Sequence, residues 1–202
     1  MMAATGADAD GARAAEAAED GALMARVRAG DEAAFAELMG RWEMPVKRVI
    51  ARIVFNAGEA EELAQETMVR VWQQREMFRD GAAARPWIFA IAVNLARNRL
   101  RWWRRRPEVS LQEWGEEEMS EIGRQKSEEK GSAALERAER AAAVRDAVAA
   151  LPLELREAIV LFEFEGLGQA EIAAAVGCSV KAVETRVARA REKLRAALRV
   201  WA

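Results

Sequence analysis

Near its C-terminus the chain reads Gln169-Ala-Glu-Ile-Ala-Ala-Ala-Val176, then Gly177-Cys-Ser179, and then a second helical pattern that starts at Val180. The small side chain of Ala173 lets two helices approach closely, and Gly177 can adopt the left-handed conformation that a tight turn between them requires. Val183 is placed to pack the second helix onto the first. This spacing predicts a helix-turn-helix, against the alternative of a plain helical hairpin with a solvated charged face.

The second helix of this pattern carries the charge that a DNA-binding helix needs. Residues 181–199 hold seven basic and two acidic side chains. A helix in the major groove places side chains against base edges near its start and cations against phosphates along its flanks. We therefore expect this helix to bind DNA through Lys181, Glu184, Thr185, Arg186 and Arg189.

The composition removes most catalytic chemistry from this chain of 202 residues. Histidine and tyrosine are absent and Cys178 is the single cysteine, which excludes Ser-His-Asp and Cys-His catalysis, most zinc and haem sites and an internal disulfide. Because neither a Gly-rich phosphate loop nor a buried carboxylate pair can be identified, we predict that the protein is not an enzyme and needs no cofactor or metal. Cys178 is expected to be a buried structural thiol, with a redox switch as the alternative.

Membrane and export signals are also missing from the sequence. It contains no apolar run of about 18 residues, and its N-terminus is acidic and Ala-rich instead of basic and then apolar. We therefore expect a cytoplasmic protein that does not insert into a membrane.

The rest of the chain predicts an all-α protein of two small helical domains. Residues 1–20 are mostly alanine and acid, too poor in large apolar groups to fold alone, which predicts a disordered tail. Residues 21–106 form the first domain, 107–132 a flexible acidic linker and 133–202 the second domain. The first strong helical face of the first domain, by its three- and four-residue steps, comprises Phe35, Leu38, Met39, Trp42, Val46, Val49, Ile50 and Ile53.

A helix that begins at Pro86 shows a polar stripe opposite its buried face. Six arginines occur between residues 97 and 106, with Trp102 and Trp103 among them. Such a mixture suits phosphate pairing together with base stacking, while a basic amphipathic surface helix is the alternative. The stripe at positions i, i+3, i+4 and i+7 consists of Asn94, Arg97, Asn98 and Arg101.

The helix that follows Gly58 has the opposite charge. Acidic side chains near the start of a helix interact favourably with the helix dipole, so a cluster of acids at this position has a purely structural explanation. The functional alternative is an acidic surface that docks on a basic partner. Its first two turns contain Glu59, Glu61, Glu62, Gln65 and Glu66.

Three segments, in order and spacing, resemble the extracytoplasmic-function sigma factors, the small sigma subunits of bacterial RNA polymerase. The first is Glu59-Ala-Glu-Glu-Leu-Ala-Gln-Glu-Thr-Met-Val-Arg-Val-Trp72, and the second is Pro86-Trp-Ile-Phe-Ala-Ile-Ala-Val-Asn-Leu-Ala-Arg-Asn-Arg-Leu100. The third runs from Leu151-Pro152 through Glu165-Gly-Leu-Gly-Gln-Ala-Glu-Ile-Ala173 to Arg189-Ala-Arg191. The resemblance covers residues 21–106, as sigma region 2, and 133–200, as sigma region 4.

The resemblance implies a transcription factor that binds core RNA polymerase, recognises the −35 and −10 promoter elements, assists melting and directs initiation at a stress or signal regulon. In the family, the acidic helix docks on the clamp coiled coil of the large subunit, here through Glu61, Glu62, Gln65 and Glu66. The next loop and the basic helix bind the −10 element, which implies roles for Phe78, Asp80, Asn94, Arg97, Asn98 and Arg101. The helix-turn-helix binds the −35 element.

Further partners follow from the same resemblance: the polymerase flap, promoter DNA and an anti-sigma factor, with the free protein a monomer. Where relatives often have Ser or Thr, Gly168 occupies the cap of the first helix of the helix-turn-helix. Glu184 and Ala188 replace residues common on the recognition face of relatives, so we expect a different −35 preference.

A stand-alone helix-turn-helix regulator remains the alternative function, because it explains the C-terminal domain without any polymerase. It leaves the acidic helix and the Asn/Arg stripe without a role. For a sigma factor, we expect the free protein to bind promoter DNA poorly, since an acidic tail and linker compete with DNA for its basic faces.

Overall fold

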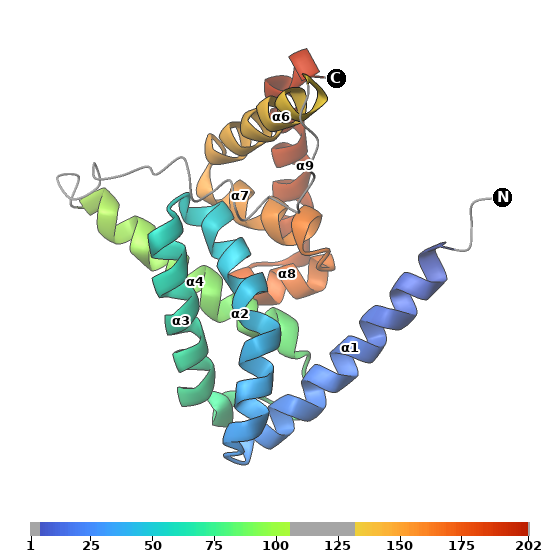
Figure 1. Ribbon diagram of the computed structural model, residues 1–202, viewed down its shortest axis with the longest axis vertical. Helices are drawn as coiled ribbons and strands as arrows, with labels where there is room; N and C mark the ends of the chain where they lie inside the picture. Colours follow the sequence, from blue (N-terminus) through green and yellow to red (C-terminus); the bar gives the residue numbers. More distant parts are fainter. Residues whose placement is uncertain (1–4, 106–131, 202) are drawn as a thin grey trace.

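The computed structural model describes residues 5–105 and 132–201, and every regular element in these ranges is helical (Figure 1). The predicted all-α fold with two helical domains is confirmed. Except for Ser132, the expected linker lies outside the described residues.

The N-terminal domain consists of four helices and a short 3₁₀ turn. Its central helix, α4, packs against the other three, and on another side it packs against a helix of the C-terminal domain. The core side chains of α4 include Ile88 and Phe89, and the Phe89 ring meets Trp42 edge to face at 5.5 Å between ring centroids. The elements are α1 (Thr5–Arg28), α2 (Glu32–Val54), α3 (Ala57–Gln73), η1 (Arg75–Met77) and α4 (Ala84–Arg105).

Side-chain caps fix where α2 and α3 begin. The carboxylate of Asp31 accepts a hydrogen bond from the Ala34 amide at 3.0 Å, and this bond, with one from Arg26, lowers the pKa of Asp31. The Asn56 side chain accepts from the Glu59 amide at 2.9 Å. The caps fix the first residue of each helix, and the two helices pack side by side to form the frame of the acidic surface described below.

Replacing Asn56 with Ala removes the cap of α3 and is expected to lower the free energy of unfolding by about 1 kcal/mol. Urea denaturation followed by circular dichroism measures the change. The substitution Asn98→Ala, at an exposed position inside α4, is the matched control and is expected to change stability little. Equal stability of Asn56→Ala and wild type would contradict the role of the cap.

The first helix differs from the expectation of a disordered tail. Residues 5–20 lie in α1, whose C-terminal part packs against α2 and buries Leu23, Met24 and Val27. Alanine has the highest helix propensity of all residues, so a helix that is anchored at one end can continue through an Ala-rich segment. The beginning of α1 projects away from the other helices (Figure 1).

The C-terminal domain contains the predicted helix-turn-helix. Gly177 ends α8 in the left-handed conformation at φ 70°, and Ser179 caps α9 by accepting a hydrogen bond from the Ala182 amide at 3.2 Å. Gly168 is the N-cap residue that precedes α8, and its amide donates to the Glu171 carboxylate at 2.7 Å, which compensates for the missing cap side chain. The elements are α6 (Ser132–Ala149), α7 (Leu153–Ile159), the π-helical segment η3 (Val160–Phe164), α8 (Gln169–Val176), α9 (Val180–Ala197) and η4 (Arg199–Trp201).

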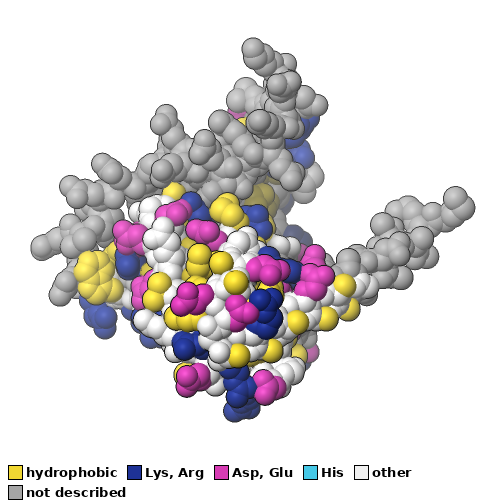
Figure 2. All heavy atoms as spheres, turned by 60° about the horizontal axis from the view of Figure 1, so that its bottom comes forward, with side chains coloured by type: hydrophobic (Ala, Val, Ile, Leu, Met, Phe, Trp, Pro, Cys, Tyr) yellow, Lys and Arg dark blue, Asp and Glu magenta, His cyan; other side chains and the backbone are white. Residues whose placement is uncertain are grey.

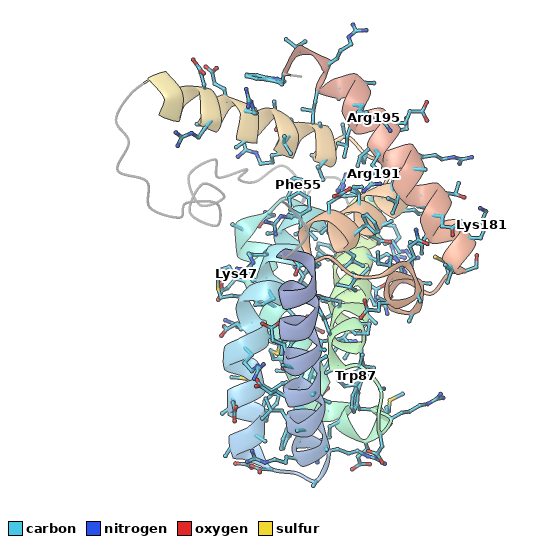
Figure 3. The ribbon with its side chains drawn as sticks, turned by 90° about the vertical axis from the view of Figure 1, so that its right-hand side faces the viewer. Lys47, Phe55, Trp87, Lys181, Arg191 and Arg195 are labelled. Carbon is cyan, nitrogen blue, oxygen red and sulfur yellow. The ribbon has the colours of Figure 1, made fainter. Side chains whose placement is uncertain are left out.

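The two domains pack directly on each other, with α8 against α4 and α7 near the end of α2. Arg156 of α7 donates to the Ile53 carbonyl at 2.7 Å and lies over the Phe55 ring at 5.1 Å from its centroid. Phe55 follows α2 in a left-handed conformation at φ 55°, and Figure 3 shows it at the boundary between the domains. This packing brings α8 against α4, so it decides which of the predicted DNA-binding residues of α4 are accessible.

Candidate nucleic-acid interface and docking surface

The predicted recognition helix, α9, turns its charged face away from the domain core. Val183, Val187 and Ala190 are buried, while the side chain of Lys181 is 86% exposed. Figure 3 shows Lys181 pointing away from the N-terminal helices. The five predicted DNA-binding residues of α9 therefore share one helix, as the sequence indicates.

Several of these side chains are ordered by local contacts. Lys181 donates to the Glu184 carboxylate at 2.8 Å, which raises the pKa of Lys181, and the Thr185 hydroxyl donates to the Lys181 carbonyl at 2.9 Å. Arg186 donates to Glu154 of α7 at 3.0 Å, and Arg189 is exposed. In this state the carboxylate of Glu184 is satisfied by Lys181, so binding to a base edge requires an exchange of partners.

The predicted stripe on α4 is divided by the domain packing. Asn94, Asn98 and Arg101 are exposed. Arg97 instead forms a fork with Glu157 of the C-terminal domain, with Nε to Oε1 at 3.0 Å and Nη2 to Oε2 at 2.7 Å. This bond raises the pKa of Arg97, and the Arg97 side chain is only 20% exposed. One of the four stripe residues is thus covered.

The two residues predicted for the loop before α4 have different surroundings. Phe78 is 3% exposed and packs edge to face on Trp87, with 5.3 Å between ring centroids. The ring therefore fills the junction between η1 and the start of α4 in this conformation and does not project into solvent, while the predicted −10 role of Phe78 stays a prediction. Asp80 is 80% exposed and pairs with Arg28 of α1 at 2.5 Å.

Substituting Phe78 with Ala is therefore expected to act first on stability, lowering the free energy of unfolding by about 3–5 kcal/mol through a cavity beside Trp87. Differential scanning calorimetry measures the loss. The exposed neighbour Met77, at 72% exposure, provides the control Met77→Ala with little expected change. A normal melting temperature for Phe78→Ala would contradict the buried position of the ring.

The predicted acidic docking residues lie together on the first half of α3. Glu61 pairs with Lys47 of α2, which lowers the pKa of Glu61, and Glu66 pairs with Arg70 at 2.6 Å. Glu62 is 71% exposed and lies 3.7 Å from Arg99 of α4. Gln65 is exposed and donates to Glu61 at 3.4 Å.

An apolar groove of about 510 Å³ continues this acidic surface between α2 and α3. Val69 and Met39, at its wall, are 51% and 36% exposed, so the prediction that Met39 lies in the buried face is wrong. The groove could not be predicted from the sequence, because only the packing of two helices shows which apolar side chains stay uncovered. The lining residues are Glu32, Phe35, Met39, Glu43, Gln65, Met68, Val69, Trp72 and Gln73.

Figure 2 shows the end of the N-terminal domain where α2 begins and α3 ends, with hydrophobic side chains lying between acidic ones. An apolar groove with a polar rim is typical of a protein-docking site. We call the groove and the neighbouring Glu61, Glu62, Gln65 and Glu66 the α2/α3 surface.

In residues 5–105 and 132–201, no cluster of three or more potential metal ligands occurs, and no helix has the length and apolar character to cross a membrane. Cys178 is partly exposed in the turn, less buried than predicted, and its thiol lies 3.5 Å from the Ser179 carbonyl oxygen.

Two family models match the chain. The model of sigma-70 region 2 matches residues 38–106, and that of sigma-70 region 4 matches residues 141–194. The first therefore covers the predicted docking helix and α4, and the second covers the helix-turn-helix. The matched ranges lie within the two domains expected from the sequence.

Curated proteins and solved structures with similar chains agree with these matches. The RNA polymerase sigma-H factor of Pseudomonas aeruginosa is 35% identical over 89% of this chain and 94% of its own. The ECF RNA polymerase sigma-E factor of Escherichia coli is 35% identical over 87% of this chain and 92% of its own. A solved structure of CnrH in complex with the cytosolic domain of CnrY has a TM-score of 0.66 at 28% identity, covering 90% of this chain and 98% of CnrH. The fold is also that of the sigma factor RpoE from Bartonella quintana, solved with the anti-sigma factor NepR, at a TM-score of 0.61, 24% identity and coverage of 82% and 97% of the two chains.

Proposed function

Because this chain belongs to the ECF sigma factors and is an alternative sigma factor that directs transcription initiation, we propose that its two domains divide the work between polymerase docking and promoter binding. The α2/α3 surface binds core RNA polymerase. The α4 stripe and α9 bind the −10 and −35 elements.

The α2/α3 surface supports the docking proposal through its chemistry. Its acids attract a basic partner and orient it, while the groove offers apolar area that a partner helix can bury. The exposed Glu62 and Gln65 lie on the same helix, α3, as the groove wall at Val69. A basic amphipathic helix, such as one helix of the clamp coiled coil, fits both the acidic residues and the apolar groove.

The α9 face supports duplex binding. Lys181, Glu184 and Thr185 lie in its first two turns, where a helix in the major groove meets base edges. Arg186 and Arg189 flank them as candidate phosphate contacts. The proposed readout includes Glu184 accepting a hydrogen bond from a cytosine amino group.

The α4 stripe supports binding of the melted −10 strand. Asn94 and Asn98 offer amides for base edges, and Arg101 offers a cation for a phosphate. Unstacking a base costs a few kcal/mol, which contacts of this kind offset. Phe78 contributes by supporting Trp87 and the start of α4 from the core.

A single observation carries the proposal: the α2/α3 surface and the helix-turn-helix occur in one chain with the sigma-70 region 2 and region 4 matches. The test is a DNase footprint on a promoter that this chain activates, with and without core polymerase. The proposal predicts protection of both elements only with core present. A −35 footprint by the protein alone, unchanged by core, would instead indicate the stand-alone regulator.

We further propose an anti-sigma factor as a partner, on the basis of the neighbour solved with the cytosolic domain of CnrY. We propose that the chain is cytoplasmic, because its polymerase partner works in the cytoplasm. We also propose that the free chain is a monomer. Size-exclusion chromatography with light scattering tests the monomer.

A further inference from the structure

An ion pair joins the end of α1 to the loop that precedes α4. Nη1 of Arg28 donates to Oδ1 of Asp80 at 2.5 Å, between residues that are 52 positions apart in sequence. The helices around this contact also pack on each other, since α1 contacts both η1 and α4. Arg28 lies outside residues 38–106, which the model of sigma-70 region 2 matches, and it is not among the predicted site residues. The contact therefore connects a residue without an assigned role to one that the resemblance places at the −10 element.

The backbone that carries Arg28 is fixed by the way in which α1 ends. The Gly30 amide donates to the Val27 carbonyl at 2.9 Å, and Gly30 has the left-handed conformation at φ 89°. The Asp31 amide donates to the Arg26 carbonyl at 3.1 Å. These two bonds form a Schellman motif, which ends a helix at a defined residue. Val27 is buried, so the last turn of α1 and the start of the Arg28 side chain are anchored to the core.

The loop that carries Asp80 is a tight turn that follows a buried residue. The Ala82 amide donates to the Arg79 carbonyl at 3.0 Å, and Gly81 takes φ 74° within the turn. Phe78, shortly before Asp80, is 3% exposed. Asp80 is the second residue of the turn, and its side chain remains 80% exposed although it is paired. The turn thus presents a carboxylate to solvent, and the pair with Arg28 restricts the direction in which that carboxylate points.

A carboxylate held in this way can distinguish between unpaired bases. An ionised carboxylate only accepts hydrogen bonds, and its two oxygens have room for more donors than one guanidinium nitrogen. Adenine, cytosine and guanine carry an exocyclic amino group that donates, whereas thymine carries none. A base that has left the stack exposes its Watson–Crick edge. Asp80 therefore favours an amino-bearing base over thymine, and the difference is largest when the carboxylate has one orientation before the base arrives.

We propose that Arg28 is a positioning residue that holds the Asp80 carboxylate toward an unpaired base. In this way Arg28 sets the preference for an amino-bearing base at one position of the −10 element. The inference rests on the proposed binding of the melted −10 strand beside α4, and it adds a residue of α1 to the surface that reads the promoter. Because the two side chains are 39% and 80% exposed, the pair contributes modestly, and we expect about a fivefold effect on base preference.

The test is transcription by holoenzyme reconstituted from core polymerase and the full-length protein, on promoters that carry each of the four bases at every −10 position. Arg28→Ala is expected to lower the ratio of transcription with an amino-bearing base to transcription with thymine about fivefold at one position. Arg28→Lys keeps a cation and is expected to retain part of the preference. In an Asp80→Ala background, Arg28→Ala is expected to cause no further loss of preference.

The matched control is Arg26→Ala, which makes the same change near the same end of α1. Arg26 has an ion pair of its own with Asp31, at 2.7 Å, and is 54% exposed. The control is expected to leave the base preference unchanged. A loss of preference equal to that of Arg28→Ala would overturn the proposal, because it would show a general effect of α1 and not of the pair with Asp80.

Two further transcription results would overturn the proposal. One is an unchanged preference for Arg28→Ala, and the other is an equal loss with all four bases, which would indicate that Arg28 contacts a phosphate. NMR relaxation of the free protein tests the pair without polymerase. The order parameter of the Arg28 Nε–H group is expected to lie above about 0.6 and to fall below that value in Asp80→Asn.

A wild-type order parameter below about 0.6 would also overturn the proposal, because the guanidinium would then not be held by Asp80. Failure of the sigma function gives a different result, since wild-type protein would then produce no transcript with core polymerase. The NMR measurement decides the inference in that case.

Discussion

Replacing Val69 with Asp is expected to weaken binding of the protein to core polymerase about 30-fold. Val69 lies in the wall of the apolar groove, where a partner helix would bury it. A carboxylate trapped at an apolar contact without a partner costs about 2 kcal/mol, which corresponds to about 30-fold in the dissociation constant. The side chain is 51% exposed in the free protein, so the substitution leaves the fold intact.

The matched control is Val200→Asp, which makes the same chemical change at an 89% exposed position of η4. Titration of fluorescently labelled protein with core polymerase gives both affinities. Wild-type affinity for Val69→Asp would show that the groove is not part of the docking surface. A similar loss for Val200→Asp would point to a general effect of added negative charge.

Replacing Glu184 with Ala is expected to relax base preference at one position of the −35 element. If Glu184 accepts from a cytosine amino group, its removal costs about 2 kcal/mol of discrimination, or about 30-fold between the preferred base and its competitors. Transcription by the reconstituted holoenzyme from a library of −35 variants measures this. Overall affinity changes less than preference, because the carboxylate adds no attraction to phosphates.

Glu192→Ala supplies the control, since Glu192 is an exposed acid on the same helix outside the predicted reading positions. It is expected to leave the preference unchanged. An unaltered preference for Glu184→Ala would contradict base readout by this residue. It would leave Lys181 and Thr185 as the candidates for reading the element.

The sequence could predict the helix-turn-helix because its determinants are local. Gly177 provides the positive φ of the turn, Ser179 caps the next helix, and Val183 follows at the spacing that reaches the core. The start of α3 also has a local determinant, the Asn56 cap, but the helix begins at Ala57, two residues before the start expected after Gly58. Propensity and spacing decide such features before any tertiary contact forms.

Features that depend on tertiary packing could not be predicted from the sequence. The burial of Phe78 depends on Trp87, nine positions away around a loop. The fork between Arg97 and Glu157 depends on how two domains meet, and helical periodicity places both residues without indicating that they touch. The groove beside Val69 likewise follows from helix packing.

The expected disordered tail shows a limit of predicting disorder from composition. Its composition indicates too little apolar surface to fold alone, but residues 5–20 continue a helix that is anchored further along by Leu23 and Met24. Composition predicts the stability of an isolated segment. It does not account for extension of a helix from an anchored end.

Run-off transcription with purified core polymerase lacking sigma, on a genomic promoter library with and without this protein, is the most direct test of the sigma function. The account predicts new transcripts whose start sites share one pair of −35 and −10 elements. It also predicts that they are lost with Glu62→Ala and with the Asn94→Ala/Arg97→Ala double variant. Absence of any new transcript, while the protein alone still protects promoter DNA, would contradict the account and favour a stand-alone regulator.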